Sequence, residues 1–204
     1  MTIHVHGIIL AGGKSSRMGQ DKALLNIHNQ PMVAYIANQL SGVCSSVTVV
    51  ASCEAVLRYR QVLDCSVRFV EDMYPHQGPL SGIHAGLRTL QGNEDVAWVM
   101  ACDMPRFSQS LFEKMKTQFL TLRNDIIMCP GQYFHAMYHP RVAIQAEIAL
   151  FNHQLKMSEF LVKLAVTYVV PEPHELQAFV NINTPEDYRS YELLLHSREN
   201  NKPI

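Results

Sequence analysis

The sequence predicts an α/β protein of three layers, in which helices cover both faces of a mostly parallel central sheet. Compact apolar runs rich in β-branched residues alternate with segments of helical periodicity, which is the order of elements that such folds require. A chain of 204 residues suits one medium domain, although length alone also allows two small ones. No internal repeat, low-complexity stretch or obvious linker interrupts the order, so we expect a single domain.

The first half of the chain predicts four strands, each followed by a helix. The runs VHGIIL and SVTVVA are short, apolar and β-branched, as buried strands are, and Pro31 suits the first turn of a helix. Pro105 ends the pairing of the fourth strand, and Leu111, Met115 and Phe119 form one apolar stripe of the helix that follows. The expected strands are 5–10, 46–51, 67–70 and 96–101, and the expected helices are 31–40, 54–63, 80–90 and 108–120.

The second half is less regular. Two strand-like runs bracket Gly131 and suggest a hairpin, and a helical segment and a further strand follow them. The last helix is marked by Thr184 as its N-cap and Pro185 at its first position. The expected strands are 125–130, 134–140 and 166–170, and the expected helices are 142–151 and 183–199.

The composition excludes several classes of protein. A formal net charge of −1 argues against a general nucleic-acid or anionic-membrane binder, because both need a broad basic surface. The five cysteines contain no CxxC pair, which is typical of reduced thiols and not of a disulfide framework or a zinc site. The N-terminus lacks a signal-peptide pattern, and no apolar stretch approaches the length of a membrane span. We therefore expect a soluble cytoplasmic protein.

The segment GIILAGGKSSRMGQDKALL, residues 7–25, combines glycines with three cations directly after a buried strand. Gly12 and Gly13 let backbone N–H groups approach phosphate oxygens, and Arg17 and Lys22 supply charge-assisted hydrogen bonds. The P-loop pattern fails because Gly19 is not followed by Lys and Ser or Thr, and the dinucleotide pattern GxGxxG fails as well. The alternative is a surface loop of solvated charges, but the combination of features favours a phosphate site.

The run LAGGKSSRMGQDK resembles the signature loop of nucleotidyltransferases with a sugar-nucleotide-transferase-type, Rossmann-like α/β fold, and more narrowly that of the molybdenum cofactor guanylyltransferases. The resemblance implies that Leu10, Ala11, Gly12 and Gly13 bind the nucleotide. It also implies that Arg17 and Lys22 contact the phosphates as catalytic groups. The related cytidylyltransferases usually carry two alanines before a single glycine, so the Gly12–Gly13 pair favours guanine.

Asp103 follows the fourth expected strand in VMACDMP. A carboxylate at a strand end suits Mg²⁺, which prefers oxygen ligands and bridges protein to phosphates. Taken alone, an Asp-x-Pro turn is more often a structural cap. The resemblance favours the metal, because the family carries its metal-binding aspartate at the end of such a strand, and it makes Asp103 part of the catalytic and nucleotide-binding set.

Two further segments are candidates for the site. The resemblance maps a Gly-Pro-Leu turn onto Gly78 and a base-binding aspartate onto Asp72, with the adjacent Glu71 as the alternative for that role. The competing interpretation of Asp72 is a solvated loop charge. The resemblance also maps an asparagine pair onto Asn181 and Asn183. Asn183 would lie near the metal or triphosphate, and both asparagines would lie near the acceptor; a turn before the last helix is the structural alternative. His135 is a weaker candidate near the second substrate, because the ten histidines form no ligand pattern and a surface or packing role is the alternative.

The resemblance implies transfer of GMP from GTP to molybdopterin with Mg²⁺, release of pyrophosphate, and transient contact with molybdoenzymes or other proteins that make the cofactor. Residues 1–105 would form the nucleotide-binding half and residues 106–204 the acceptor-binding half. The alternatives are a cytidylyltransferase or sugar-phosphate nucleotidyltransferase of the same fold, or a non-catalytic carrier that binds the nucleotide. A nicotinamide-dependent oxidoreductase is disfavoured by the failed GxGxxG pattern.

Overall fold

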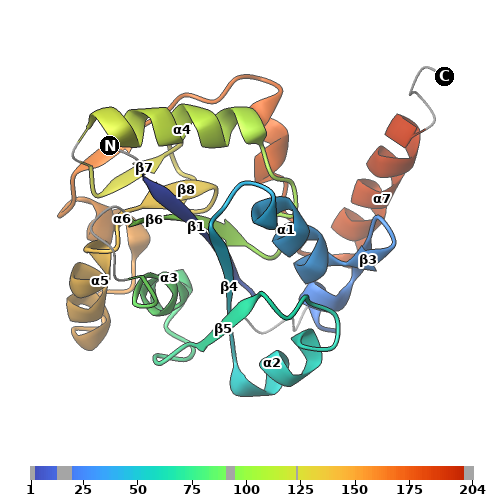
Figure 1. Ribbon diagram of the computed structural model, residues 1–204, viewed down its shortest axis with the longest axis horizontal. Coiled ribbons are helices and arrows are strands. Elements are labelled where there is room, and N and C mark those ends of the chain that lie inside the picture. The colour runs from blue at the N-terminus through green and yellow to red at the C-terminus, as the bar shows by residue number, and fades with distance from the viewer. Residues whose placement is uncertain (1–2, 13–19, 91–94, 123, 200–204) are drawn as a thin grey trace.

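The computed structural model describes residues 3–12, 20–90, 95–122 and 124–199, and these form a seven-stranded sheet between two layers of helices (Figure 1). The strand order is β5-β4-β1-β6-β8-β7-β9. Within this sheet β8 alone runs against its neighbours, so the expectation of a mostly parallel sheet is confirmed. The strands are β1 (His4–Leu10), β4 (Ser46–Ala51), β5 (Arg68–Glu71), β6 (Asp95–Ala101), β7 (Ile126–Met128), β8 (Ala136–Tyr138) and β9 (Val166–Tyr168).

Every expected helix is present, with bounds that differ by a few residues. Ser108 caps α4 by accepting a hydrogen bond from the backbone N–H of Leu111, and Thr184 caps α7 through the N–H of Asp187. The helix expected at 54–63 is shorter in the structure: it ends at Tyr59, and the chain continues in turns. The helices are α1 (Met32–Ser41), α2 (Cys53–Tyr59), α3 (Pro79–Leu87), α4 (Gln109–Thr121), α5 (Val142–Phe151) and α7 (Pro185–Glu199).

The hairpin expected around Gly131 is confirmed, because β7 and β8 pair antiparallel with Ile126 opposite Tyr138. Gly131 lies in the connecting loop with a φ of 72°. Several short elements were not expected, since each is too short to show a periodicity in the sequence. They are η1 (Lys22–Leu24), the ribbon of β2 (Asn26–Ile27) and β3 (Gln30–Pro31), α6 (Met157–Leu161) and η2 (Glu175–Phe179).

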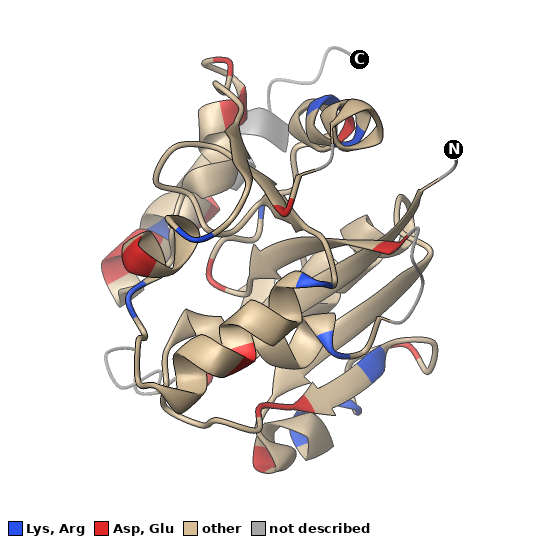
Figure 2. Ribbon diagram, turned by 90° about the vertical axis from the view of Figure 1, so that its left-hand side faces the viewer, with Lys and Arg blue, Asp and Glu red and all other residues tan. Residues whose placement is uncertain are grey.

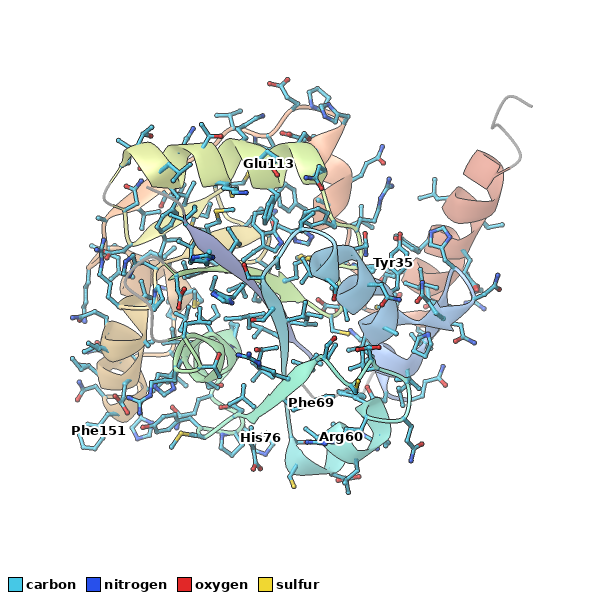
Figure 3. All side chains as sticks on the ribbon, viewed as in Figure 1. Tyr35, Arg60, Phe69, His76, Glu113 and Phe151 are labelled. Atoms are coloured by element: carbon cyan, nitrogen blue, oxygen red, sulfur yellow. The ribbon has the colours of Figure 1, made fainter. Side chains whose placement is uncertain are left out.

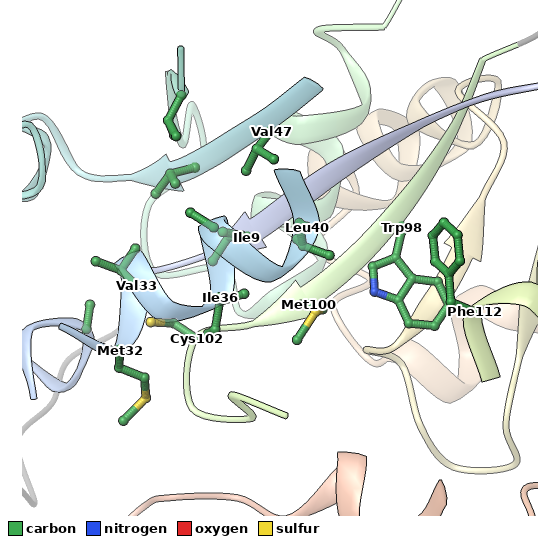
Figure 4. Packing of buried hydrophobic residues seen from close by; sticks show 14 of the residues in the cluster. Ile9, Met32, Val33, Ile36, Leu40, Val47, Trp98, Met100, Cys102 and Phe112 are labelled. Atoms are coloured by element: carbon green, nitrogen blue, oxygen red, sulfur yellow. The ribbon is translucent and has the colours of Figure 1, made fainter. Parts of the chain in front are cut away.

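Side chains of β1 alternate between two apolar cores. Val5 and Ile9 contribute to the core under α1 and α4, whereas Ile8 and Leu10 contribute to the core under α3 and α5. Figure 4 shows the first core, where Ile9 and Leu40 lie near Val47 and the ring of Trp98 faces Phe112. The alternation fixes the register of β1 and therefore the point at which its chain leaves the sheet.

Helix α3 packs against β1 through two glycines. A Cβ atom on Gly86 would come within 2.5 Å of the Ile8 side chain, and one on Gly82 would come within 3.3 Å of Leu10. The helix starts after Gly78, whose φ of 75° is a conformation that side chains rarely adopt. Small residues thus let α3 approach the sheet, and Gly78 turns the chain into its first residue, Pro79.

The distribution of charge, the lengths of the apolar helices and the state of the cysteines agree with the composition. Lys and Arg are interspersed with Asp and Glu over several elements and form no continuous band of one sign on the face shown in Figure 2. No helix in the described residues is long and apolar enough to cross a membrane. All five cysteines are free thiols.

Candidate functional site

The carboxyl ends of β4, β1 and β6 meet at one edge of the sheet, and the described part of the glycine-rich segment leaves from there. Pairing continues past the ends of the strands, because Ala11 donates its N–H to the Val50 carbonyl and Cys102 donates to the Leu10 carbonyl, both at 2.9 Å. Gly12 is exposed, and a Cβ at this position would meet no atom within 4 Å. Ligands of parallel α/β sheets bind at this edge.

Gly13 and Arg17, to which the resemblance assigns contacts with the nucleotide and its phosphates, lie outside the described residues, as do Lys14 and Gly19 of the same segment.

Lys22, Asp103 and Asn183 come together from three distant parts of the chain. The Lys22 ammonium in η1 donates a hydrogen bond of 2.8 Å to the side-chain oxygen of Asn183 and lies 4.0 Å from an Asp103 carboxylate oxygen. The two side chains of the ion pair are mostly buried, with 17% of Lys22 and 32% of Asp103 exposed. A cation, a carboxylate and an amide oxygen therefore line the edge of the sheet beside Gly12.

Partial burial and the nearby cation act in opposite directions on Asp103. Removal from water raises the pKa of this carboxyl group, and Lys22 offsets part of that increase. No group of three or more His, Cys, Asp and Glu side chains in the described part of the chain is arranged to hold a metal ion by itself. A single carboxylate fits Mg²⁺ only where substrate phosphates supply other ligands, which is the usual way in which this ion is bound.

The asparagine pair lies directly beside Asp103. Ile182, between the two asparagines, donates its backbone N–H to the Asp103 carbonyl at 2.8 Å and is completely buried. Asn181 is exposed and Asn183 half-buried. The Asp187 carboxylate holds the segment in place by accepting hydrogen bonds from the N–H groups of Asn183 and Thr184, at 2.9 and 2.8 Å. The first turn of α7 therefore places the pair at the site.

Asp72 orders the loop before α3. One carboxylate oxygen accepts a 2.9 Å hydrogen bond from the backbone N–H of Tyr74, and the other lies 2.7 Å from the Ser81 hydroxyl. That hydroxyl is also 2.8 Å from the Gly78 carbonyl, so its one proton is shared between two acceptors. Asp72 is half-buried and Glu71 is exposed. The competing interpretation of Asp72 as a merely solvated charge does not describe this loop, because both oxygens have protein partners.

His135 does not reach the surface. It is fully buried against the rings of Trp98 and Phe179, and its Nε2 lies 2.8 Å from the Arg106 carbonyl oxygen, to which it donates when protonated at that atom. Burial lowers the pKa of the imidazole to about 4, so the ring is neutral at physiological pH. His135 is therefore a packing residue of the core, which is the alternative that the sequence left open, and not a group near a substrate.

Three residues near Lys22 were missed by the sequence analysis. Asp21, the residue before Lys22, accepts hydrogen bonds from the Tyr59 hydroxyl and the Arg58 guanidinium. Arg58 and Tyr59 belong to α2, which carries no motif. Their proximity follows only from the order of strands, because α2 begins where β4 ends at the same edge of the sheet.

A family model described as the MobA-like NTP transferase domain matches residues 7–167, most of the chain. The chain belongs to this family. The match includes the glycine-rich segment, Lys22, Asp72 and Asp103, and it ends before the asparagine pair. As a MobA-like domain, the chain has a seven-stranded sheet and flanking helices of the expected nucleotidyltransferase fold.

Relatives of this MobA-like chain match it over almost their whole length. A protein of Vibrio atlanticus named molybdenum cofactor guanylyltransferase is 32% identical over 191 residues, which cover 90% of this chain and 93% of that protein. A probable molybdenum cofactor guanylyltransferase of Pelotomaculum thermopropionicum is 34% identical over 190 residues, covering 89% and 88%.

Solved structures share the fold at lower identity. Molybdopterin-guanine dinucleotide biosynthesis protein A of Archaeoglobus fulgidus superposes with a TM-score of 0.79 at 24% identity, over 94% of this chain and 99% of that one. The 4-diphosphocytidyl-2C-methyl-D-erythritol synthase of Anaerococcus prevotii gives 0.70 at 14% identity, over 95% and 96%. Proteins named for guanine and for cytidine products thus share this architecture, so the fold by itself does not select the base.

Proposed function

We propose that this protein is a molybdenum cofactor guanylyltransferase, which transfers GMP from GTP to the terminal phosphate of molybdopterin. An acceptor phosphate oxygen forms a bond to the α-phosphorus, the bond from that phosphorus to the β-phosphate oxygen breaks, and pyrophosphate leaves. The observation that carries the proposal is the cluster of Lys22, Asp103 and Asn183 beside the open backbone of Gly12. The names and coverage of the relatives support the substrates.

The nucleotide would extend along the edge of the sheet from α3 to Asp103. Leu10, Ala11 and Gly12 leave β1 at the centre of this edge, and their backbone would contact the nucleotide, together with Gly13. Asp72 retains acceptor capacity on its ordered carboxylate, which suits the N1–H and N2–H donors of guanine. The turn at Gly78 brings that carboxylate to the start of α3.

Charge neutralisation and alignment would supply the catalysis. The Lys22 ammonium would contact phosphate oxygens, together with Arg17. Asp103 would hold Mg²⁺ with substrate phosphates as further ligands, and the amide oxygen of Asn183 is a second candidate ligand. The ion would offset negative charge on the phosphates as the leaving group departs.

No general base is required on the acceptor side. A phosphate monoester has a second pKa of about 6 and is largely dianionic at neutral pH, so its oxygen is already a nucleophile. Asn181 is exposed next to Asn183 and would donate hydrogen bonds to the acceptor. We assign the acceptor subsite to the half of the chain formed by residues 106–204 and the nucleotide subsite to residues 1–105.

Replacement of Asp103 or Lys22 by Ala tests the assignment. Each variant is expected to lose on the order of 2.7–4 kcal/mol of transition-state stabilisation, a hundredfold or more in rate, because each removes a charge next to the reacting phosphates. Pyrophosphate release and the dinucleotide product are measured with GTP, Mg²⁺ and molybdopterin. The control is Glu113→Ala, which removes an exposed carboxylate on α4. Near-normal turnover of either site variant would refute the catalytic role of the residue that it replaces.

Competition among nucleotides separates the proposal from its alternatives. Guanylyl transfer predicts that unlabelled GTP suppresses product formation more strongly than CTP, ATP or UTP does. Preference for CTP would indicate a cytidylyltransferase, and tight binding of GTP without pyrophosphate release in the presence of molybdopterin would indicate a non-catalytic carrier. The cytoplasmic location and the transient contact with molybdoenzymes stay predictions.

A further inference from the structure

A hydrogen-bonded network lies at the end of the glycine-rich segment, and the proposed mechanism does not use it. Asp21 caps η1 by accepting the N–H of Ala23 at 3.1 Å. The Tyr59 hydroxyl lies 3.0 and 3.1 Å from its two carboxylate oxygens, and the Arg58 guanidinium donates to one of them at 2.9 Å. The carboxylate next to the proposed phosphate-binding lysine therefore accepts hydrogen bonds from three donors.

The same tyrosine hydroxyl also lies near the start of the segment. It is 3.4 Å from the carbonyl oxygen of Ala11, the residue that continues β1 beyond the sheet. Ala11 and Asp21 are the two ends between which the glycine-rich residues run. The hydroxyl has one proton, which the nearer and charged Asp21 carboxylate accepts, so the Ala11 carbonyl is a longer, secondary contact.

The side chain of Tyr59 is buried in the core, which restricts its movement. Its side chain is 1% exposed and belongs to the core under α1. Helix α2 is capped at its start by the Ser52 hydroxyl, and just after its end the Arg60 guanidinium lies 5.2 Å from the ring centre of Phe69 on β5 (Figure 3). The cap stabilises the start of the helix, and the Arg60–Phe69 contact joins its end to the sheet.

The network also neutralises the charge of Asp21. A bare carboxylate on Asp21 beside a triphosphate would repel it, since like charges in a partly buried site interact strongly. The Arg58 guanidinium forms a charged pair with Asp21, and the side chains of the pair are 47% and 20% exposed. The network thus holds Asp21 in place and offsets its negative charge, which lies next to Lys22 in the sequence.

We propose that Tyr59 and Asp21 are positioning residues for nucleotide binding, which hold the start of η1 against α2 and direct Lys22 toward the phosphates. This inference rests on the proposed function, because it assigns Lys22 a phosphate to bind. Neither residue contacts the nucleotide. Their effect passes through Lys22.

A double-mutant cycle tests the inference with the affinity for Mg²⁺-GTP as the readout. Tyr59→Phe removes only the hydroxyl and keeps the buried ring, so the fold is retained, which a thermal unfolding curve checks. We expect this variant to bind Mg²⁺-GTP about tenfold more weakly, because it loses one hydrogen bond to a charged group that orders the site. In the Lys22→Ala background the same substitution is expected to change the affinity less than twofold.

The matched control is Tyr138→Phe. Tyr138 is also fully buried and also donates one hydroxyl hydrogen bond, to the Tyr133 carbonyl at 2.7 Å, but it lies on β8 in the other half of the chain. The Tyr138→Phe variant should bind Mg²⁺-GTP with the same affinity as the wild-type protein. A tenfold loss in Tyr138→Phe as well would show that the effect of Tyr59→Phe is general destabilisation, and would overturn the inference.

The remaining outcomes separate the inference from the proposed function. If the wild-type protein binds Mg²⁺-GTP and Tyr59→Phe weakens binding equally with and without Lys22, Tyr59 does not act through Lys22 and the inference is wrong while the proposed function stands. If the wild-type protein binds no Mg²⁺-GTP, the proposed function fails and the inference fails with it. Restored affinity in Asp21→Asn relative to Asp21→Ala would support the capping role, because Asn retains an acceptor for Ala23 and Tyr59.

Discussion

Lys22 stabilises the ionised form of Asp103, which partial burial disfavours. Its ammonium lies 4.0 Å from the carboxylate and lowers a pKa that desolvation has raised. The hydrogen bond to Asn183 fixes the direction of the ammonium. A carboxylate kept ionised in a partly dry site binds a cation more strongly than a fully solvated one, because less water must be displaced. The proposed metal ligand is therefore paired with a cation 81 positions earlier in the sequence.

His135 predicts a pH dependence of stability that is separate from the site. Its folded pKa of about 4 lies below the ordinary value of 6.5, so the unfolded chain binds a proton that the folded chain does not. Stability is therefore intact above about pH 6.5 and falls as the pH is lowered toward 4, by roughly a few kcal/mol for this residue. Free energies of unfolding from urea titrations between pH 7 and pH 4 measure the slope.

Replacement of His135 by Asn isolates this contribution. Asn tolerates the positive φ of 52° at this position, so the backbone is retained, although the smaller side chain lowers stability at every pH. The loss between pH 6.5 and pH 4 should be smaller than in the wild-type protein. His153→Asn is the control, since His153 is exposed and has a nearly identical φ of 53°. An unchanged slope in His135→Asn would contradict the assignment.

Helix α3 depends on Gly86 for its distance from the sheet. In Gly86→Ala the new methyl group would lie 2.5 Å from the Ile8 side chain, so either the helix or β1 must shift. We expect a loss of stability of about 1–3 kcal/mol, as for other overpacked cores. The free energy of unfolding in urea measures it. The shift would also move the Gly78 turn and the Asp72–Ser81 contact at the start of the helix.

Gly42→Ala is the matched control for Gly86→Ala. Gly42 follows α1 with an ordinary helical φ of −76°, and its added Cβ would come no closer than 3.6 Å to another atom. This substitution should be neutral or slightly stabilising, because Ala restricts the unfolded chain. Equal losses at positions 42 and 86 would show that the close packing of α3 on β1 is not the cause.

One sheet joins the two halves of the chain. Strand β6 of the first half pairs with β8 of the second, and the only tryptophan, Trp98 on β6, is fully buried with its ring centre 5.2 Å from that of Phe112 on α4. Residues 1–105 and 106–204 thus share a core, which favours a single cooperative unit. The interface between the halves is formed by strand pairing and aromatic packing.

We therefore predict one unfolding transition for the whole chain. Trp98 fluorescence reports on the junction of the halves and far-UV circular dichroism on the helices of both, so the two urea curves should have the same midpoint. Two separate midpoints would show that the halves unfold independently and would support two domains.

Much of this architecture is visible in local patterns. The strand of β1 and the stripe of α4 follow from periodicity, and the capped start of α7 follows from Thr184 and Pro185, because these features are decided by neighbours in the sequence. The elements that were missed, such as η1 and the β2–β3 ribbon, are two or three residues long and are held by tertiary contacts. One of these contacts is the hydrogen bond of 2.6 Å from the Tyr188 hydroxyl on α7 to the Asn26 carbonyl.

The sequence by itself determined the α/β class, the positions of the main strands and helices, and the family to which the glycine-rich segment belongs. Only the tertiary structure decided that Lys22 contacts Asn183, that the Tyr59 hydroxyl lies near both Ala11 and Asp21, and that His135 is buried. The reason is physical. Periodicity and capping act within a few residues, whereas these contacts join positions separated by up to 161 residues and arise only when the strands take their order in the sheet.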